Sequence, residues 1–115
     1  MGNVIHVDNS AFFRKIMRAY LLELGIESES YEQGREALFA ASTGAVSCVI
    51  TGLELPDMKG EEFIQQLAAL GHPISVIVFS AITDESRIKF LETQGVVGIV
   101  EKTSNWKKDL QNFFF

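Results

Sequence analysis

The stretch VSCVITGLELPDMKG, residues 46–60, is the part of the sequence that decides the fold. It begins with Val46–Thr51, a nearly continuous apolar run of strand length, which is typical of a parallel strand covered by helices on both faces. Pro56 falls in the loop that follows, and Gly60 stands at the start of a helical pattern. A buried strand that is followed at once by a helix is the repeating unit of an α/β fold.

Similar units lie on both sides of this stretch. Further strands are predicted at Val4–Val7, Ile26–Ser30, Ile74–Phe79 and Val96–Val100, and helical patterns cover residues 13–24, 33–43, 60–70, 84–94 and 104–114. Glu27 and Glu29 mark the second strand as an edge strand. Strict alternation with short connections predicts a parallel sheet with right-handed crossovers, and five strands favour the order 2-1-3-4-5. We therefore expect a three-layer α/β domain with the flavodoxin-like (βα)5 fold.

Length, composition and charge exclude several classes of protein. The 115 residues suit one domain, and 47% apolar with 22% charged side chains excludes general disorder. A net charge of −5 with scattered basic residues argues against a nucleic-acid surface. The single cysteine, Cys48, permits neither a disulfide framework nor a thiolate metal site and fits a reducing compartment. No stretch is long enough to span a membrane and no signal peptide is visible, so we expect a cytoplasmic domain without membrane contact.

Polar side chains follow the predicted strands at their carboxyl ends, where the functional crevice of such a sheet lies. Asp8 and Asn9 follow the first strand, Gly52 the third, Ser80 the fourth and Lys102 the fifth. We expect an acidic group, a hydroxyl and a lysine to meet there. The sequence has no glycine-rich phosphate loop, and an aspartate at the first turn repels phosphate, which argues against flavin or dinucleotide binding.

Five segments, taken in order, resemble the receiver domain of bacterial response regulators, and the chemotaxis regulators in particular. Val7–Ser10 matches that family's acidic turn, and Gly34–Leu38 matches its second helix. Val49–Gly60 matches the phosphoacceptor strand with its loop. Phe79–Ala81 contains the switch hydroxyl, and Gly98–Lys102 is the lysine segment. The resemblance covers essentially the whole chain at the family's spacing. It implies that residues 1–115 form one signalling domain of a longer two-component regulator.

The sequence departs from this family at the residues that carry phosphotransfer. Receivers of the family use an acceptor aspartate and an acidic pair that together hold Mg²⁺. The resemblance places the acceptor four positions before Pro56, at Gly52, which has no nucleophile, and Asn9 stands for the second acid of the pair. Asp8 is then the one remaining carboxylate and at best a weak metal ligand, so we expect Mg²⁺ binding to be lost or weak and no cofactor to be used.

Two more departures point in the same direction. Ile99 stands where the family has an aromatic switch residue, and Thr103 where it has a proline. The resemblance therefore implies a pseudo-receiver: a phosphorylation-independent protein-interaction module, not an enzyme. Its degenerate phosphorylation pocket consists of Asp8, Asn9, Gly52, Glu54, Ser80 and Lys102.

Two other functions stay open at this point. One is an active phosphotransfer receiver that uses Glu54, Asp57 or Asp8 as a non-standard acceptor. The other is a small α/β enzyme or ligand-binding domain with Asp8 and Lys102 at its crevice. Because an unpaired ammonium in a partly buried crevice is costly, we predict that Lys102 turns toward Asp8 or Glu54.

The resemblance also implies where a partner binds. Receivers commonly meet partners, or each other, through the fourth helix, fifth strand and fifth helix. The candidate residues on this face are Phe90, Ile99, Trp106 and the terminal Phe113, Phe114 and Phe115. An exposed Trp106 would mark a binding hot spot, whereas a buried one would belong to the core. The expected partner is another protein, an output domain or a second copy of the chain.

Overall fold

A computed structural model describes residues 3–81 and 84–114 of the chain. Within this part, five strands form one parallel sheet in the order β2-β1-β3-β4-β5. The strands are β1 (Val4–Val7), β2 (Ser28–Tyr31), β3 (Cys48–Thr51), β4 (Ser75–Ser80) and β5 (Gly98–Glu101). They alternate with α1 (Ala11–Glu23), α2 (Gly34–Ala41), α3 (Gly60–Ala68), α4 (Glu85–Thr93) and α5 (Trp106–Gln111). The predicted three-layer fold and its strand order are confirmed.

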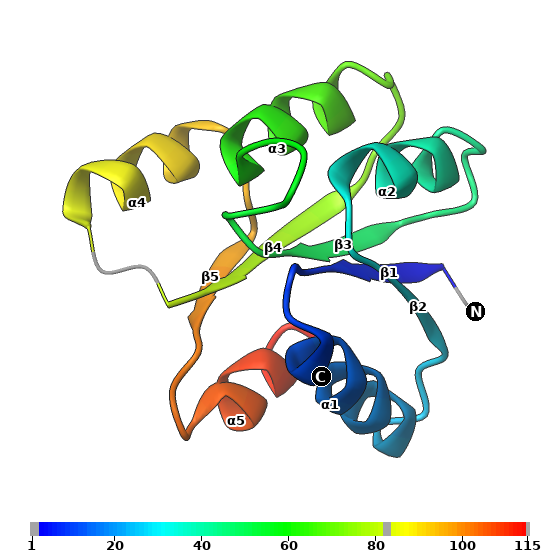
Figure 1. Cartoon of the computed structure of the whole chain (residues 1–115), viewed down its shortest axis with the longest axis vertical. Helices are drawn as coiled ribbons and strands as arrows, with labels where there is room; N and C mark the ends of the chain where they lie inside the picture. Colours follow the sequence, from blue (N-terminus) through cyan, green and yellow to red (C-terminus); the bar gives the residue numbers. More distant parts are fainter. Residues whose placement is uncertain (1–2, 82–83, 115) are drawn as a thin grey trace.

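The helices cover both faces of the sheet, α1 and α5 on one side and α2, α3 and α4 on the other (Figure 1). Each face carries its own apolar core because successive strand residues point to opposite sides. Val49 of β3 packs with Phe63 on the α2–α3–α4 side, and its neighbour Ile50 packs with Leu21 on the α1–α5 side. The central strands β1 and β3 are buried throughout, which explains why they are almost continuously apolar.

Cys48 begins β3 and is buried in the core on the α1–α5 side. Burial raises the pKa of its thiol to about 11. The side chain therefore behaves as a small apolar group, as expected from its place in an apolar run.

Most element boundaries lie one to three residues from their predicted places, which is the usual scatter at element ends. The second strand begins later than predicted, at Ser28, because the end of α1 uses the preceding residues for its turn. Gly25 takes a φ of 82°, which favours glycine, and the N–H of Ile26 donates to the carbonyl of Leu21 at 2.8 Å.

The fifth helix, α5 (Trp106–Gln111), is shorter than the predicted 104–114, and its end is followed by a turn at Phe113 and Phe114. The N–H groups of Phe113 and Phe114 donate to carbonyls three residues earlier, so the chain leaves α-helical geometry after Gln111. The ring of Phe113 then lies against Gly98 of β5. A Cβ at Gly98 would come within 2.1 Å of that ring, so the contact needs a glycine.

A second glycine joins the end of β3 to the start of α3. The N–H of Gly60 donates to the carbonyl of Leu53 at 2.8 Å. A Cβ on Gly60 would lie only 2.7 Å from the carbonyl oxygen of Gly52 and 2.8 Å from the Cα of Leu53. The loop between β3 and α3 can close over the strand end only because this side chain is absent.

We therefore predict that Gly60→Ala lowers the free energy of unfolding by about 1–3 kcal/mol, as overpacking typically does. Gly52→Ala is the matched control, because its Cβ would meet no atom closer than 3.6 Å. Urea denaturation of the two variants measures the difference. Equal stability of both would show that the β3–α3 loop relaxes freely.

Candidate functional site

An ion pair lies at the carboxyl ends of the strands. Nζ of Lys102, just after β5, is 2.9 Å from Oδ2 of Asp8, just after β1. Asp8 is 1% exposed and Lys102 15%. The lysine also lies over two aromatic rings, 4.3 Å from the ring centre of Phe13 and 5.3 Å from that of Phe79. The predicted pairing of Lys102 with Asp8 is confirmed.

Two further groups contact the Asp8 carboxylate. Its Oδ1 accepts a hydrogen bond from the N–H of Ser10 at 2.9 Å, and its Oδ2 lies 3.5 Å from Nε2 of the buried His6. Burial by itself raises the pKa of Asp8, but the contacts with His6, Lys102 and Ser10 outweigh it and hold this pKa below its usual value. Burial also lowers the pKa of His6. At neutral pH the cluster beside Lys102 therefore contains an aspartate anion and a neutral histidine.

Gly52 lies beside this pair at the end of β3. Its N–H donates to the carbonyl of Val7 at 2.8 Å, and a Cβ there would lie 3.6 Å from Oδ2 of Asp8. Ser80, half-buried at the end of β4, joins the site through its carbonyl, which accepts from the N–H of Lys102 at 2.9 Å. Asn9 is exposed. The structure thus brings Asp8, Gly52, Ser80 and Lys102 together at one edge of the sheet.

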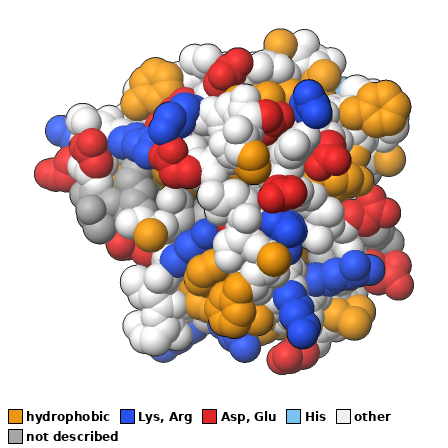
Figure 2. Space-filling model, in the orientation of Figure 1, with side chains coloured by type: hydrophobic (Ala, Val, Ile, Leu, Met, Phe, Trp, Pro, Cys, Tyr) orange, Lys and Arg blue, Asp and Glu red, His pale blue; other side chains and the backbone are white. Residues whose placement is uncertain are grey.

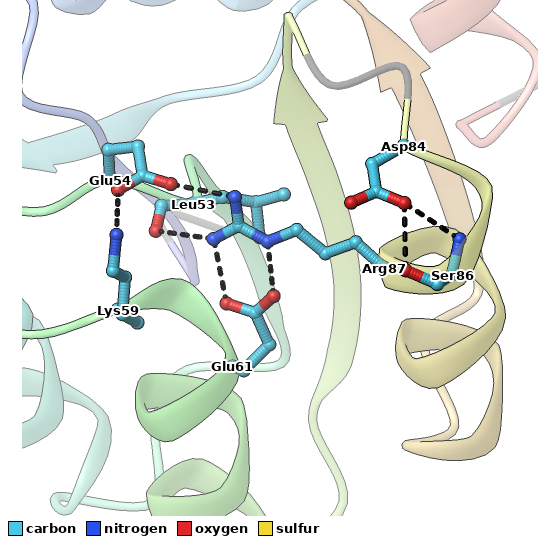
Figure 3. Close-up of polar contacts among 7 residues, drawn as sticks. All are labelled: Leu53, Glu54, Lys59, Glu61, Asp84, Ser86 and Arg87. Carbon is cyan, nitrogen blue, oxygen red and sulfur yellow. Dashed lines mark hydrogen bonds and ion pairs between the residues drawn. The ribbon is translucent and has the colours of Figure 1, made fainter.

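Glu54 belongs to a separate network that ties the β3–α3 loop to α4 (Figure 3). One of its oxygens pairs with Lys59, and the other lies 2.7 Å from Nη1 of Arg87 in α4. Arg87 also pairs with Glu61 at the start of α3, and its Nη2 lies 3.4 Å from the carbonyl of Leu53. These contacts lower the pKa of Glu54 and of Glu61, so both are anions at neutral pH.

Asp57 serves the start of a different helix. Its two oxygens accept hydrogen bonds from the N–H groups of Gly34 and Arg35 at 2.8 and 3.0 Å. These N–H groups open α2 and have no partner within the helix, so the carboxylate caps that helix from the β3–α3 loop.

Sequence reasoning missed the roles of four of these residues: Arg87, Glu61, Asp57 and His6. Arg87 and Glu61 meet across 26 positions, and Asp57 meets Gly34 across 23, so no local pattern marks either contact. His6 had a usable signal: it lies two positions before Asp8, and alternate residues of a strand share a face.

The sequence model for the response regulator receiver domain matches residues 4–112. The chain belongs to that family.

The receiver domain is similar to several known proteins. It is 28% identical to a protein-glutamate methylesterase/protein-glutamine glutaminase of a Nocardioides species, over 80% of this chain and 26% of the relative. It is 27% identical to the transcriptional regulatory protein PcoR of Escherichia coli, over 80% of this chain and 41% of PcoR. The chain thus spans less than half the length of these curated relatives. The solved structure of the chemotaxis protein CheY4 of Vibrio cholerae matches with a TM-score of 0.86 at 24% identity, over 99% of this chain and 97% of CheY4.

The α4–β5–α5 side of the receiver domain carries the residues that were predicted to meet a partner. Phe90 of α4 is 41% exposed, and Ile99 of β5 and Phe114 are half-buried. Trp106 is only 7% exposed, with its ring 5.5 Å from that of Tyr20 and 5.2 Å from that of Phe79. Trp106 therefore belongs to the core and is not an exposed anchor, while Phe115 lies outside the described residues.

The peptide bonds of the described residues are trans, including the bond between Lys102 and Thr103.

Among those same residues, no helix of the receiver domain has the length and apolar character needed to cross a bilayer.

We predict strong coupling between Asp8 and Lys102 in the stability of the receiver domain. Asp8→Asn and Lys102→Met each leave one buried charge without its partner, so each should lower the free energy of unfolding by about 2–4 kcal/mol. The double variant Asp8→Asn/Lys102→Met removes both charges and should lose less than the sum of the two. Urea denaturation measures all three. Additive losses would mean that the two side chains do not depend on each other.

Proposed function

We propose that this receiver domain is a phosphorylation-independent protein-interaction module of a two-component system. The observation that carries the proposal is the Asp8–Lys102 pair beside Gly52. By its resemblance to other receivers, Gly52 stands where the phosphoacceptor would be, and it offers no nucleophile. The lysine that would contact a phosphoryl group is already neutralised by Asp8.

The residues of this site do not fit Mg²⁺. Among residues 3–81 and 84–114, no three His, Cys, Asp or Glu side chains are grouped so as to hold a metal ion. Mg²⁺ demands several oxygen ligands in near-octahedral geometry. Asp8 supplies one carboxylate, and the Lys102 ammonium 2.9 Å away competes with any cation for it. We therefore propose a domain without a cofactor and without enzymatic activity.

Other acceptors are less well supported because their carboxylates are occupied. Glu54 is paired with Lys59 and Arg87, and Asp57 caps α2. Asp8 is 1% exposed, which also disfavours its use as a nucleophile or as part of a small-molecule site. Phosphotransfer through one of these groups would have to break contacts that stabilise the fold.

The partner surface that we propose lies between α4 and β5. Phe90 is exposed on α4, and a hollow of about 340 Å³ lies between the two elements. Its lining combines the apolar Ile88, Val96 and Ile99 with the carboxylates of Glu92 and Glu101. Arg87 holds α4 against the β3–α3 loop, and Ile99 has no ring to reorient. The surface is therefore held in one shape and suits a protein partner, an output domain or a second receiver.

We predict that the receiver domain gains no phosphoryl group from a small phosphodonor in the presence of Mg²⁺. Intact-mass measurement checks this directly. A gain of one phosphoryl mass that Asp8→Ala, Glu54→Ala or Asp57→Ala abolishes would disprove phosphorylation independence and identify the acceptor.

A separate titration tests the missing Mg²⁺ ligands. A Cβ at Gly52 would meet no atom closer than 3.6 Å, so Gly52→Asp should fold, but it still lacks the second acid at Asn9. Gly52→Asp/Asn9→Asp should therefore bind Mg²⁺ more tightly than Gly52→Asp in a fluorescence titration. Equal titrations for the two variants would contradict this account of the missing ligands.

We also predict that a photocrosslinking amino acid at position 90, on α4, gives a protein adduct in cells, whereas the same group at the exposed Ala45 does not. Ile99→Asp should reduce the adduct from position 90, because it removes an apolar contact from the hollow and adds a third carboxylate beside Glu92 and Glu101. The adduct's mass distinguishes a second copy from another partner. Equal adducts from both positions would place the partner surface elsewhere.

A further inference from the structure

The charged side chains are unequally divided between the two helical layers. Helices α1 and α5 carry five basic and two acidic residues, whereas α2, α3 and α4 carry three basic and five acidic ones. The whole chain has a net charge of −5, so the basic layer stands out against an acidic protein. Figure 2 shows Lys and Arg side chains around an apolar patch in the half of the molecule where α1 lies.

The basic side chains of α1 and α5 are not neutralised within the molecule. They are Arg14, Lys15, Arg18, Lys107 and Lys108, and none of them lies within 4.0 Å of a carboxylate in the part of the chain that the structure describes. On the opposite layer, Glu36 and Glu62 likewise have no cationic partner among the described residues. Within residues 3–81 and 84–114, the α1–α5 layer therefore presents unpaired positive charge that can attract acidic groups, and the α2–α3–α4 layer presents unpaired negative charge that can attract basic groups.

One stripe of α1 combines this charge with exposed apolar groups. Phe12, Lys15, Arg18 and Leu22 follow each other at spacings of three or four residues, so they share one face of the helix. Phe12 is 65% exposed and Leu22 is 62% exposed. We call these four residues the α1 patch.

The acidic layer carries a matching combination. Phe39 of α2 is 79% exposed, and Glu36 lies one turn before it on the same helix. Glu62 is exposed on the neighbouring α3. We call Glu36, Phe39 and Glu62 the α2–α3 patch. It offers what the α1 patch lacks: acidic groups beside an exposed aromatic ring.

We propose that the α1 patch of one copy binds the α2–α3 patch of a second copy. The two patches lie on opposite sides of the sheet, so the contact joins unlike surfaces and cannot close into a two-fold dimer through the same pair of patches (Figure 1). The product is a short, open, head-to-tail chain. This surface is separate from the α4–β5 partner surface.

Charge and apolar groups have different roles in this contact. Each exposed ion pair strengthens association only a few-fold, so two such pairs together strengthen it about tenfold, and complementary charge also orients the two copies and speeds their encounter. Burial of Phe12, Leu22 and Phe39 supplies the rest of the affinity. Because the charges are exposed, salt screens them, and association is strongest at low ionic strength.

Sedimentation velocity of the wild-type protein over a range of concentrations tests the proposal. In buffer of about 0.02 M ionic strength the weight-average mass should rise beyond that of a dimer, and at about 0.5 M it should return toward the monomer. A protein that stays monomeric at both ionic strengths overturns the proposal. So does a species that stops at the dimer.

Two variants with neutral substitutions locate the contact. Lys15→Gln/Arg18→Gln disables the α1 patch, and Glu36→Gln/Glu62→Gln disables the α2–α3 patch; each alone should associate at least about tenfold more weakly than the wild type. An equimolar mixture retains one intact pair of patches and should form dimers that grow no further. Wild-type association by both variants, or no dimer in the mixture, overturns the proposal.

Matched controls separate this contact from other surfaces. Lys107→Gln/Lys108→Gln on α5 changes the net charge as Lys15→Gln/Arg18→Gln does, and it should associate like the wild type. Phe90→Ala, on the α4–β5 surface, should also leave the weight-average mass of the assembly unchanged. The proposal would be overturned if either control lost association while Lys15→Gln/Arg18→Gln associated like the wild type. Self-association would then belong to the surface that carries the substitution in that control.

Discussion

The ion pair between Asp8 and Lys102 is the contact on which the strand ends depend. It joins the carboxyl ends of β1 and β5, which are not neighbours in the sheet, so the lysine side chain reaches past the ring of Phe79 on β4. The Asp8 carboxylate also accepts a hydrogen bond from the N–H of Ser10, the residue that caps α1. The backbone carbonyl of Asp8 accepts a hydrogen bond from Arg14 at 2.7 Å. The start of α1 and the ends of two strands therefore converge on one buried carboxylate.

The fold was predictable because it rests on patterns that are local in the sequence. Each buried strand is a short apolar run, and each run is followed by a helical pattern, which leaves few arrangements for a parallel sheet. The Asp8–Lys102 pair was predictable for a different reason: the predicted strands placed both residues at carboxyl ends of one parallel sheet, and burial makes an unpaired ammonium costly. Both predictions followed from a general free-energy cost, of exposing apolar strands in one case and of burying an unpaired charge in the other. Neither depended on a detail of packing.

The contacts that escaped prediction are those between distant residues with no such constraint. Nothing near Asp57 indicates that it caps a helix 23 positions earlier, and nothing near Arg87 indicates Glu61 as its partner. Trp106 was placed correctly on a helix, but its burial depends on Tyr20 and Phe79, which come from α1 and β4. The contact of the Phe113 ring with β5 depends on the absence of a side chain at Gly98. Such contacts need three-dimensional coordinates because many alternatives satisfy the same sequence pattern.

The burial of Cys48 has a practical consequence for chemical labelling. With its pKa raised to about 11, the thiol is almost wholly protonated at neutral pH, and its neighbours in the core shield it from reagents. The chain has no other cysteine. A cysteine introduced at an exposed position would therefore react alone with a maleimide, so a fluorophore or spin label can be attached to either helical layer without first replacing Cys48.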